Sequence, residues 1–116
     1  RMPNDCLFCK IISGEIPSKE VYSDDHVYAF YDINPAAPAH VLVVPRKHLS
    51  AVNDQSEEHE ALFGALIVAA NKIVGRLGLE KSGFRYVVNT GGDGGQTVFH
   101  LHLHILGGRP LGWPPG

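Results

Sequence analysis

Between residues 100 and 104 three histidines alternate with two leucines, and this pattern restricts the fold more than any other feature of the chain. Successive side chains of a β-strand point to opposite faces, so we expect the imidazoles on one face and Leu101 and Leu103 in a core on the other. Residues 91–97, just upstream, are rich in glycine, which lets backbone amides approach an anion closely. The two segments together predict a histidine nucleophile that acts on a phosphorylated substrate.

Two other interpretations of the alternating histidines compete with a nucleophile. One is a surface strand whose polar face happens to be histidine, although histidine is not favoured in strands. The other is a catalytic metal held by all three rings. Positions 100 and 104 of a strand lie roughly 13 Å apart, whereas each ring nitrogen must come within about 2.1 Å of a zinc ion. Geometry therefore favours a nucleophile with neighbouring helpers over a three-histidine metal site.

Length and charge limit the possible partners. The 116 residues, 44% hydrophobic and 19% charged, are typical of one soluble domain, expected over residues 4–116. A net charge of −2 without a run of lysine or arginine argues against nucleic-acid polymers and anionic membranes, but not against single nucleotides. No apolar stretch approaches a membrane span, and two cysteines without a secretion signal favour the cytoplasm.

Hydrophobic periodicity predicts an α+β fold. A short helix is expected from an Asp5 cap to Ser13, ended by Gly14, and a long helix at 57–77, with Asp54 and Glu57 as a capping box and Gly78 as its end. The expected strands are 21–23, 27–31, 40–44, 84–89 and 98–106. Short connections favour a mainly antiparallel sheet of about five strands with one long and one short helix.

The same residues resemble a known family. The segment 100–106 is similar to the signature of the histidine triad (HIT) superfamily, in which histidines alternate with apolar residues. Residues 94–97, Asn89, residues 30–33 and the terminal Trp-Pro-Pro-Gly at 113–116 resemble its histidine triad nucleotide-binding (Hint) branch. The resemblance implies a HIT-like fold whose sheet continues across a homodimer. It also implies a purine nucleoside phosphoramidase, which releases an amine and a nucleoside monophosphate such as AMP or GMP.

The resemblance implies a role for each catalytic position. His102 corresponds to the nucleophile, whose Nε2 forms a covalent nucleotidyl-histidine; its Nδ1 should then hold a proton that a backbone carbonyl accepts. His104 corresponds to a phosphate contact and His40 to a histidine that supports the nucleophile. Thr97, with Gly95 and Gln96, matches the segment that supplies amide and hydroxyl donors to the phosphoryl oxygens and the leaving nitrogen.

The resemblance also implies the nucleotide contacts. Asp32 corresponds to the carboxylate that accepts the ribose hydroxyls, and Asn89 to a contact on the phosphate and ribose side. The apolar slot for the base corresponds to Leu7, Phe8, Ile11, Phe30 and Ile33, although Leu7 and Ile11 could equally be core residues. Trp113 corresponds to a residue that approaches the partner subunit's site; by itself it could be a packed terminus.

Cys6 and Cys9 lie one helical turn apart, so their thiols share a face. Two further ligands would complete a tetrahedral zinc site, and His48 and His100 are the candidates. We expect such a zinc to be structural, with no cofactor required for catalysis. Two inert buried thiols are the main alternative, and a redox pair is disfavoured because no thioredoxin-like strand and helix surround it. His26 and His59 are expected to be ordinary surface residues.

Two further functions remain open at this point. One is a hydrolase of dinucleoside polyphosphates from the same superfamily, which the Trp-Pro-Pro-Gly ending disfavours. The other is a nucleotide-responsive binding module without catalysis, which would not need the nucleophile at position 102. The expected partners are thus a purine nucleotide and a second copy of the chain.

Overall fold

The computed structural model describes residues 5–54 and 56–116, so residue 4, at the predicted start of the domain, lies outside the described part. Within it the elements run α1 (Leu7–Ser13), β1 (Glu20–Ser23), β2 (Val27–Tyr31), β3 (Ala39–Pro45), α2 (Glu60–Arg76), β4 (Phe84–Val87) and β5 (Leu103–Gly107). Two 3-10 turns, Val52–Asp54 and Glu57–His59, precede α2. The predicted α+β class, with five strands, one short and one long helix, is confirmed.

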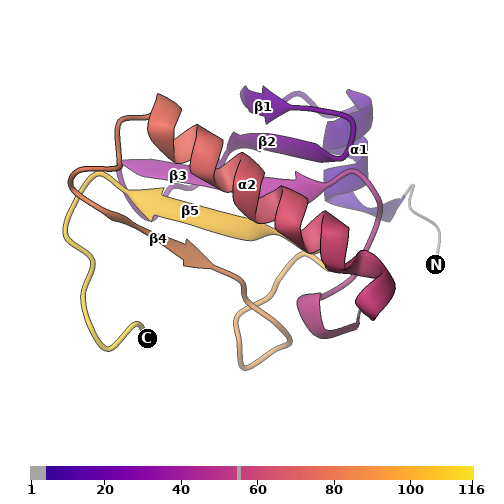
Figure 1. The fold of residues 1–116 in the computed structure, drawn as a ribbon. Helices are drawn as coiled ribbons and strands as arrows, with labels where there is room; N and C mark the ends of the chain where they lie inside the picture. Colours follow the sequence, from indigo (N-terminus) through magenta and orange to yellow (C-terminus); the bar gives the residue numbers. More distant parts are fainter. Residues whose placement is uncertain (1–4, 55) are drawn as a thin grey trace.

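The five strands form one sheet in the order β1-β2-β3-β5-β4, and every neighbouring pair is antiparallel (Figure 1). β5 lies between β3 and β4, so β3 and β4 run in the same direction and need a crossover, which α2 supplies. In the register of β3 and β5, His40 faces Leu106 and Leu42 faces His104. The last strand of the chain thereby brings the alternating histidines beside the middle of the sheet.

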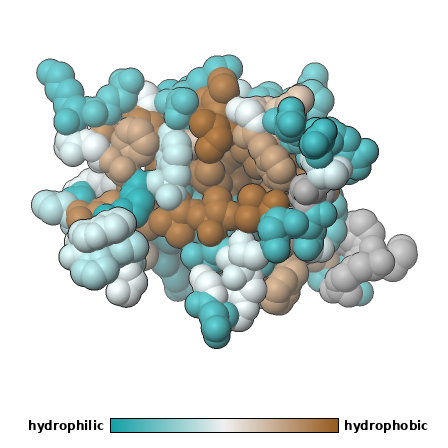
Figure 2. Space-filling model, turned by 60° about the horizontal axis from the view of Figure 1, so that its bottom comes forward, coloured by the Kyte–Doolittle hydropathy of each residue, from teal (hydrophilic) through white to brown (hydrophobic). Residues whose placement is uncertain are grey.

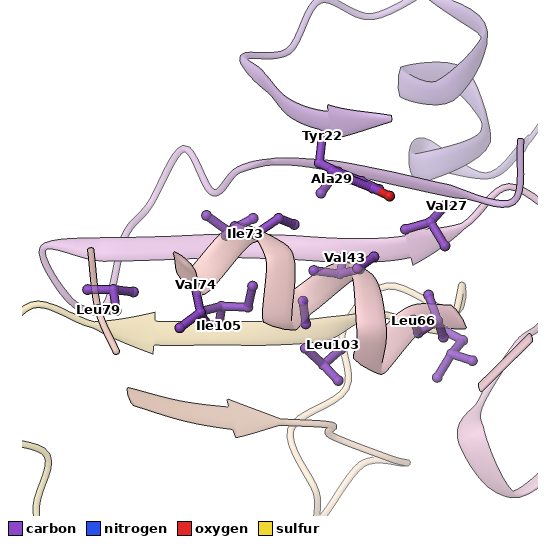
Figure 3. Packing of buried hydrophobic residues seen from close by; sticks show 14 of the residues in the cluster. Tyr22, Val27, Ala29, Val43, Leu66, Ile73, Val74, Leu79, Leu103 and Ile105 are labelled. Carbon is purple, nitrogen blue, oxygen red and sulfur yellow. The ribbon is translucent and has the colours of Figure 1, made fainter. Parts of the chain in front are cut away.

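Each face of the sheet is covered by one helix. The α2 face holds the larger core, in which Leu66 and Ile73 of α2 pack with Val43, Leu103 and Ile105 of the strands (Figure 3). The α1 face holds a smaller cluster of Cys6, Phe8, Ile11, Tyr28, Phe30, Leu42 and Val44. Because both faces of the sheet are covered at β2 and β3, consecutive residues of these strands are buried, and their sequences are nearly continuous apolar runs.

The alternation after residue 100 has the predicted effect, but over a shorter strand. Leu101 and Leu103 belong to the α2 core, while the rings of His100 and His102 contact Phe8 on the α1 face. The predicted strand 98–106 is wrong before residue 103. The Leu101 amide donates to the carbonyl of Leu49, a loop residue, at 2.6 Å, so the chain lies outside the ladder there, and residues 98–100 form bends.

Other predicted boundaries are corrected by local hydrogen bonds. Cys6, not Asp5, caps α1, because its sulfur accepts from the Cys9 amide; Gly14 ends the helix in the left-handed conformation as predicted. The capping box of Asp54 and Glu57 is wrong, because these residues lie in two separate 3-10 turns and α2 begins only at Glu60. β4 ends at Val87 rather than at 89, and β3 includes Pro45. No helix in the described residues has the length and apolar character needed to cross a membrane.

Candidate active site

A groove of about 410 Å³ opens on the α1 face of the sheet, between α1, the end of β2 and the chain that leads into β5. It brings together the residues that the sequence analysis assigned to the base, the ribose and the phosphate. These are Leu7, Phe8, Ile11, Phe30, Asp32, Ile33, Thr97, His102 and His104. Apolar side chains thus line one part of the groove, and a carboxylate, a hydroxyl and two imidazoles line the rest.

His102 is held in one tautomer. Its Nδ1 lies 2.7 Å from the carbonyl oxygen of His100, and since a carbonyl only accepts, Nδ1 carries the proton. The Nε2 lone pair is then free. Burial lowers the pKa of His102 below its ordinary value, although the His100 carbonyl and Asp32 act against this. Phe8 packs edge-on against the ring, with centroids 5.0 Å apart, and restricts its rotation. The result is a neutral, oriented imidazole with an available lone pair.

A second chain of hydrogen bonds orients His104. The Ala36 amide donates to His40 Nδ1 at 3.0 Å, so the proton of neutral His40 lies on Nε2. That Nε2 is 2.9 Å from His104 Nδ1, which therefore accepts and leaves the proton of His104 on its own Nε2. His104 Nε2 is buried and has no partner among the described residues. Since His104 lines the groove, it offers an unsatisfied N–H donor there, as a phosphoryl oxygen requires.

Burial keeps this second pair neutral as well. It lowers the pKa of His104 to about 4, with the neighbouring His102 and His40 adding to the effect. Burial also lowers the pKa of His40, against the attraction of Asp32, whose Oδ2 lies 3.5 Å from His40 Nε2. Asp32 is itself fixed by the Asn34 amide, which donates to Oδ1 at 2.8 Å. A half-buried carboxylate and a neutral histidine pair therefore stand side by side at one end of the groove.

The glycine-rich segment closes on itself and differs here from its predicted role. The Gly95 amide donates to the carbonyl of Gly92 and the Gln96 amide to that of Gly91, each at 3.0 Å, so both amides are engaged within the loop. The Gln96 side chain is only 6% exposed and points inward. Thr97 is the residue of this segment that lines the groove. In this conformation the donor offered by the segment is Thr97, because the turn uses the preceding amides.

Two other assigned positions lie outside the groove lining. Asn89 follows the end of β4 and is half-buried. Trp113 is 82% exposed in the C-terminal tail, so the alternative of a packed terminus is wrong for this chain by itself. Two smaller expectations are also decided: Leu7 is exposed rather than a core residue, and His59 is partly buried against Lys47 rather than on the open surface.

Sequence reasoning missed several groove residues. Tyr31 and Asn34 flank the assigned Asp32 and Ile33, and their nearness along the chain was a usable signal. Ile16, Pro17, Ser18, Leu42 and Val98 also line the groove. Nothing in their local pattern marks them, because the segment after α1, strand β3 and the chain before β5 meet at the groove only through tertiary packing.

A second cluster lies beside the groove, where α1 meets the chain before β5. Ligand atoms of Cys6, Cys9, His48 and His100 all lie within 4.8 Å of one another. His100 is fully buried, and its Nε2 donates to the carbonyl of Pro45 at 2.8 Å, so Nδ1 faces the sulfurs with its lone pair. Its Nδ1 is 3.3 Å from Cys6 Sγ, 3.6 Å from Cys9 Sγ and 3.1 Å from His48 Nδ1. The edges of a tetrahedron around zinc measure about 3.4–3.8 Å, so the four atoms fit such an ion.

The alternating histidines therefore serve two separate clusters. His100 belongs to the cysteine set, whereas His104 groups with Asp32 and His40. Within the described residues no candidate set contains all three rings, in agreement with the strand geometry. Burial raises the pKa of the Cys9 thiol to about 11, with Cys6 contributing, which disfavours a reactive redox thiolate.

The fold and the groove define a class of protein. Its antiparallel sheet presents an oriented imidazole, His102, beside the hydrogen-bond donor His104 and the carboxylate of Asp32. Comparison with known proteins agrees. The HIT domain family model matches residues 13–111. The purine nucleoside phosphoramidase of Escherichia coli K12 is 50% identical over 111 residues, covering 96% of this chain and 93% of that protein.

Solved structures show the same relationship. A HIT family hydrolase from Legionella pneumophila superposes with a TM-score of 0.94 at 46% identity, covering 96% of this chain and 99% of that one. A histidine triad nucleotide-binding protein from Candida albicans superposes with a TM-score of 0.80 at 31% identity, covering 94% and 82%. The chain belongs to the HIT family, in its nucleotide-binding branch, and is a hydrolase.

Proposed function

We propose that this chain hydrolyses the P–N bond of purine nucleoside 5′-phosphoramidates and releases an amine and a nucleoside monophosphate. One observation carries the proposal: the 2.7 Å bond from His102 Nδ1 to the His100 carbonyl, which leaves Nε2 with a lone pair in a groove shared with Asp32 and His104. The identity to the Escherichia coli phosphoramidase supports the choice of substrate class.

In the first step His102 Nε2 attacks the phosphorus. A P–Nε2 bond forms, the P–N bond to the amine breaks, and the leaving nitrogen takes up one proton from solvent in the open groove. His104 Nε2–H donates to a phosphoryl oxygen, and the hydroxyl of Thr97, which also lines the groove, serves the leaving nitrogen. Neutral rings suit both tasks, since a protonated His102 would have no lone pair. A preorganised donor of this kind contributes about 10²–10³-fold.

In the second step water attacks the phosphorus of the nucleotidyl-histidine. A P–O bond forms, the P–Nε2 bond breaks, and the water proton returns to solvent, which restores His102. His40 acts through His104 by keeping its proton on Nε2. The Asp32 carboxylate accepts hydrogen bonds from the ribose hydroxyls. Phe8, Phe30 and Ile11 enclose the base, and Ile33, which is 91% exposed, lies at the mouth of the groove.

Cys6, Cys9, His48 and His100 would hold a structural zinc ion. Such an ion would tie α1 to the chain that leads into β5, and all four of its positions would be filled by protein atoms. It would fix the backbone at residue 100, whose carbonyl orients His102. It would take no part in the bond making, and Cys6 and Cys9, which form no disulfide, are both available as its ligands.

We also propose a homodimer formed through β4. β4 is an edge strand of the sheet, and no other strand of the described residues pairs with its outer side. Figure 2 brings forward the side on which β4 and the C-terminal tail lie in Figure 1, and a band of apolar residues crosses it. Pairing two β4 strands would continue the sheet and carry the exposed Trp113 toward the partner subunit. Sedimentation equilibrium should give twice the chain mass; a monomer at micromolar concentration would contradict this.

The decisive experiment traps the covalent intermediate. The protein is mixed with adenosine 5′-phosphoramidate, quenched within milliseconds, digested and analysed by mass spectrometry. We expect an adenylyl group on the peptide that contains His102, and its absence in His102→Ala, with His26→Ala as a matched control. An adduct on another residue, or full turnover by His102→Gly, would contradict the proposal.

The same assay separates the competing functions. Faster cleavage of a diadenosine polyphosphate than of the phosphoramidate would identify a dinucleoside polyphosphate hydrolase. Binding of AMP without turnover of either substrate would identify a nucleotide-responsive binding module.

A further inference from the structure

A second hollow adjoins the groove, and the mechanism above does not use it. It measures about 450 Å³ and is lined by Asp5, Cys6, Leu7, His48, Thr97, Val98 and Phe99. Leu7, Thr97 and Val98 line both hollows, whereas His102 and His104 line only the first. The two spaces therefore meet along these three residues, and Thr97 is the one that the family resemblance matches to the leaving nitrogen.

Phe99 is the unexplained residue of this hollow. If the alternation of residues 100–104 extended back to position 99, Phe99 would lie on the same side as Leu101 and Leu103, which are at most 4% exposed in the α2 core. Phe99 is instead 58% exposed. The chain has not yet joined the sheet at this point, since β5 begins at Leu103. Burying a phenylalanine ring is worth about 1.5–3 kcal/mol. The ring of Phe99 is not buried in the core and lines the second hollow, so it is available to contact a ligand.

In-line displacement determines what enters the second hollow. The leaving nitrogen departs on the side of the phosphorus opposite to His102 Nε2, because nucleophile, phosphorus and leaving atom lie on one line. The second hollow is lined by neither His102 nor His104, and it shares with the groove Thr97, the residue matched to the leaving nitrogen. It is therefore placed to receive the leaving group rather than the nucleoside.

We propose that the second hollow is the leaving-group subsite and that Phe99 selects amines which carry an aromatic group. The inference rests on the proposed function and adds the class of the amine. Cys6 and His48 line the hollow but belong to the metal set, so its apolar contacts are Phe99, Val98 and the exposed Leu7, of which only Phe99 is aromatic. An aryl ring stacked on Phe99 would fill the hollow while its amine nitrogen stays bonded to phosphorus at Thr97.

Two substrates that differ only in the amine test the subsite. Adenosine 5′-phosphoramidates of 2-phenylethylamine and of methylamine share the nucleotide and differ in the ring. We expect Phe99→Ala to lower kcat/KM for the phenylethyl substrate about 3- to 10-fold, the range of an aromatic pair, and to leave the methyl substrate unchanged. Val68→Ala is the control, because Val68 is an exposed apolar residue on α2, away from β4, that lines neither hollow.

The outcomes separate this inference from the function on which it rests. An equal effect of Phe99→Ala on both substrates, or no effect on either, would overturn the subsite while His102 still forms its adduct. Failure of the wild-type protein to cleave either substrate would instead overturn the proposed function. Inhibition by AMP reports an intact nucleotide groove in each variant. Phe99→Leu, which keeps an apolar side chain without a ring face, should retain the fold and still lose the preference.

Discussion

At the scale of single residues, one hydrogen bond to each imidazole decides what that imidazole can do. The His100 carbonyl makes His102 a nucleophile, and the Ala36 amide, acting through His40, makes His104 a donor. The three rings are chemically identical before folding. Their different roles come from the partners that the backbone places beside one nitrogen of each.

His40→Ala tests the relay to His104. Without His40 Nε2–H, His104 is free to hold its proton on Nδ1, and the groove loses its oriented donor. We expect kcat to fall about 10-fold or more, since a hydrogen bond to a buried group is worth about 1–3 kcal/mol. Steady-state kinetics on the phosphoramidate provide the measurement, with His26→Ala as the control. A kcat within two-fold of the wild type would argue against the relay.

The lowered pKa of His104 predicts how stability depends on pH. Its pKa is about 4 in the folded state and about 6.5 when unfolded, so between these values the unfolded chain binds more protons. The stabilisation is fully present above pH 6.5 and is lost as the pH falls toward 4. In His104→Gln we expect a shallower decline of the unfolding free energy, by up to about 1.4 kcal/mol per pH unit.

Urea denaturation of wild type and His104→Gln at pH 7, 6 and 5 provides this comparison. His40 and His102, whose pKa values are also lowered, remain in both proteins, so the difference between the curves reports His104 together with its coupling to these two rings. Parallel curves for the two proteins would show that His104 titrates normally.

At the scale of elements, the glycine-rich loop is held by one buried side chain. Gln96 Nε2 donates to the carbonyls of Ser50 at 2.8 Å and Val98 at 3.1 Å, and its Oε1 accepts from the Gly91 amide at 3.1 Å. These bonds join both ends of the loop to the segment after β3. A Cβ at Gly94 would lie 2.2 Å from the Thr90 carbonyl oxygen, so the tight turn also requires glycine there. The loop is thus a rigid support for Thr97.

Gln96→Leu should therefore destabilise the protein and impair the site. It preserves volume but leaves the Gly91 amide and two carbonyls without their partner, at a cost of about 1–3 kcal/mol. We expect that loss in urea denaturation, together with a lower kcat as Thr97 loses its support, and no change in Asn53→Leu on the exposed surface. Unchanged kcat in a folded Gln96→Leu protein would show that the loop does not position Thr97.

At the scale of the whole molecule, the two faces of the sheet have different tasks. The α2 face is a continuous apolar core, whereas the α1 face combines a small core with the groove and the cysteine cluster. α1 is only seven residues long, too short to be stable by its own hydrogen bonds. Its packing, and the proposed metal, must therefore hold it over the groove.

Removal of the metal tests that role. We expect protein purified without added zinc to contain one zinc per chain, and a strong chelator to lower the melting temperature and weaken AMP binding together, because α1 carries Phe8 and Ile11 of the groove. Cys9→Ser should reproduce the chelated state. Substoichiometric metal with unchanged melting would exclude a structural zinc.

The local pattern of the chain determined the fold class, the elements and the face of each histidine, because alternation and helical periodicity act over a few residues. It also brought Cys6, Cys9, His48 and His100 under consideration as one set, through their chemistry. Only the tertiary structure decided that β5 lies between β3 and β4, which pairs His104 with His40, and that Phe99 lies outside the core. Such contacts join residues far apart along the chain, so no local pattern can predict them. Specific hydrogen bonds, rather than residue propensities, also decide that Cys6 caps α1 and that the histidine strand begins at Leu103.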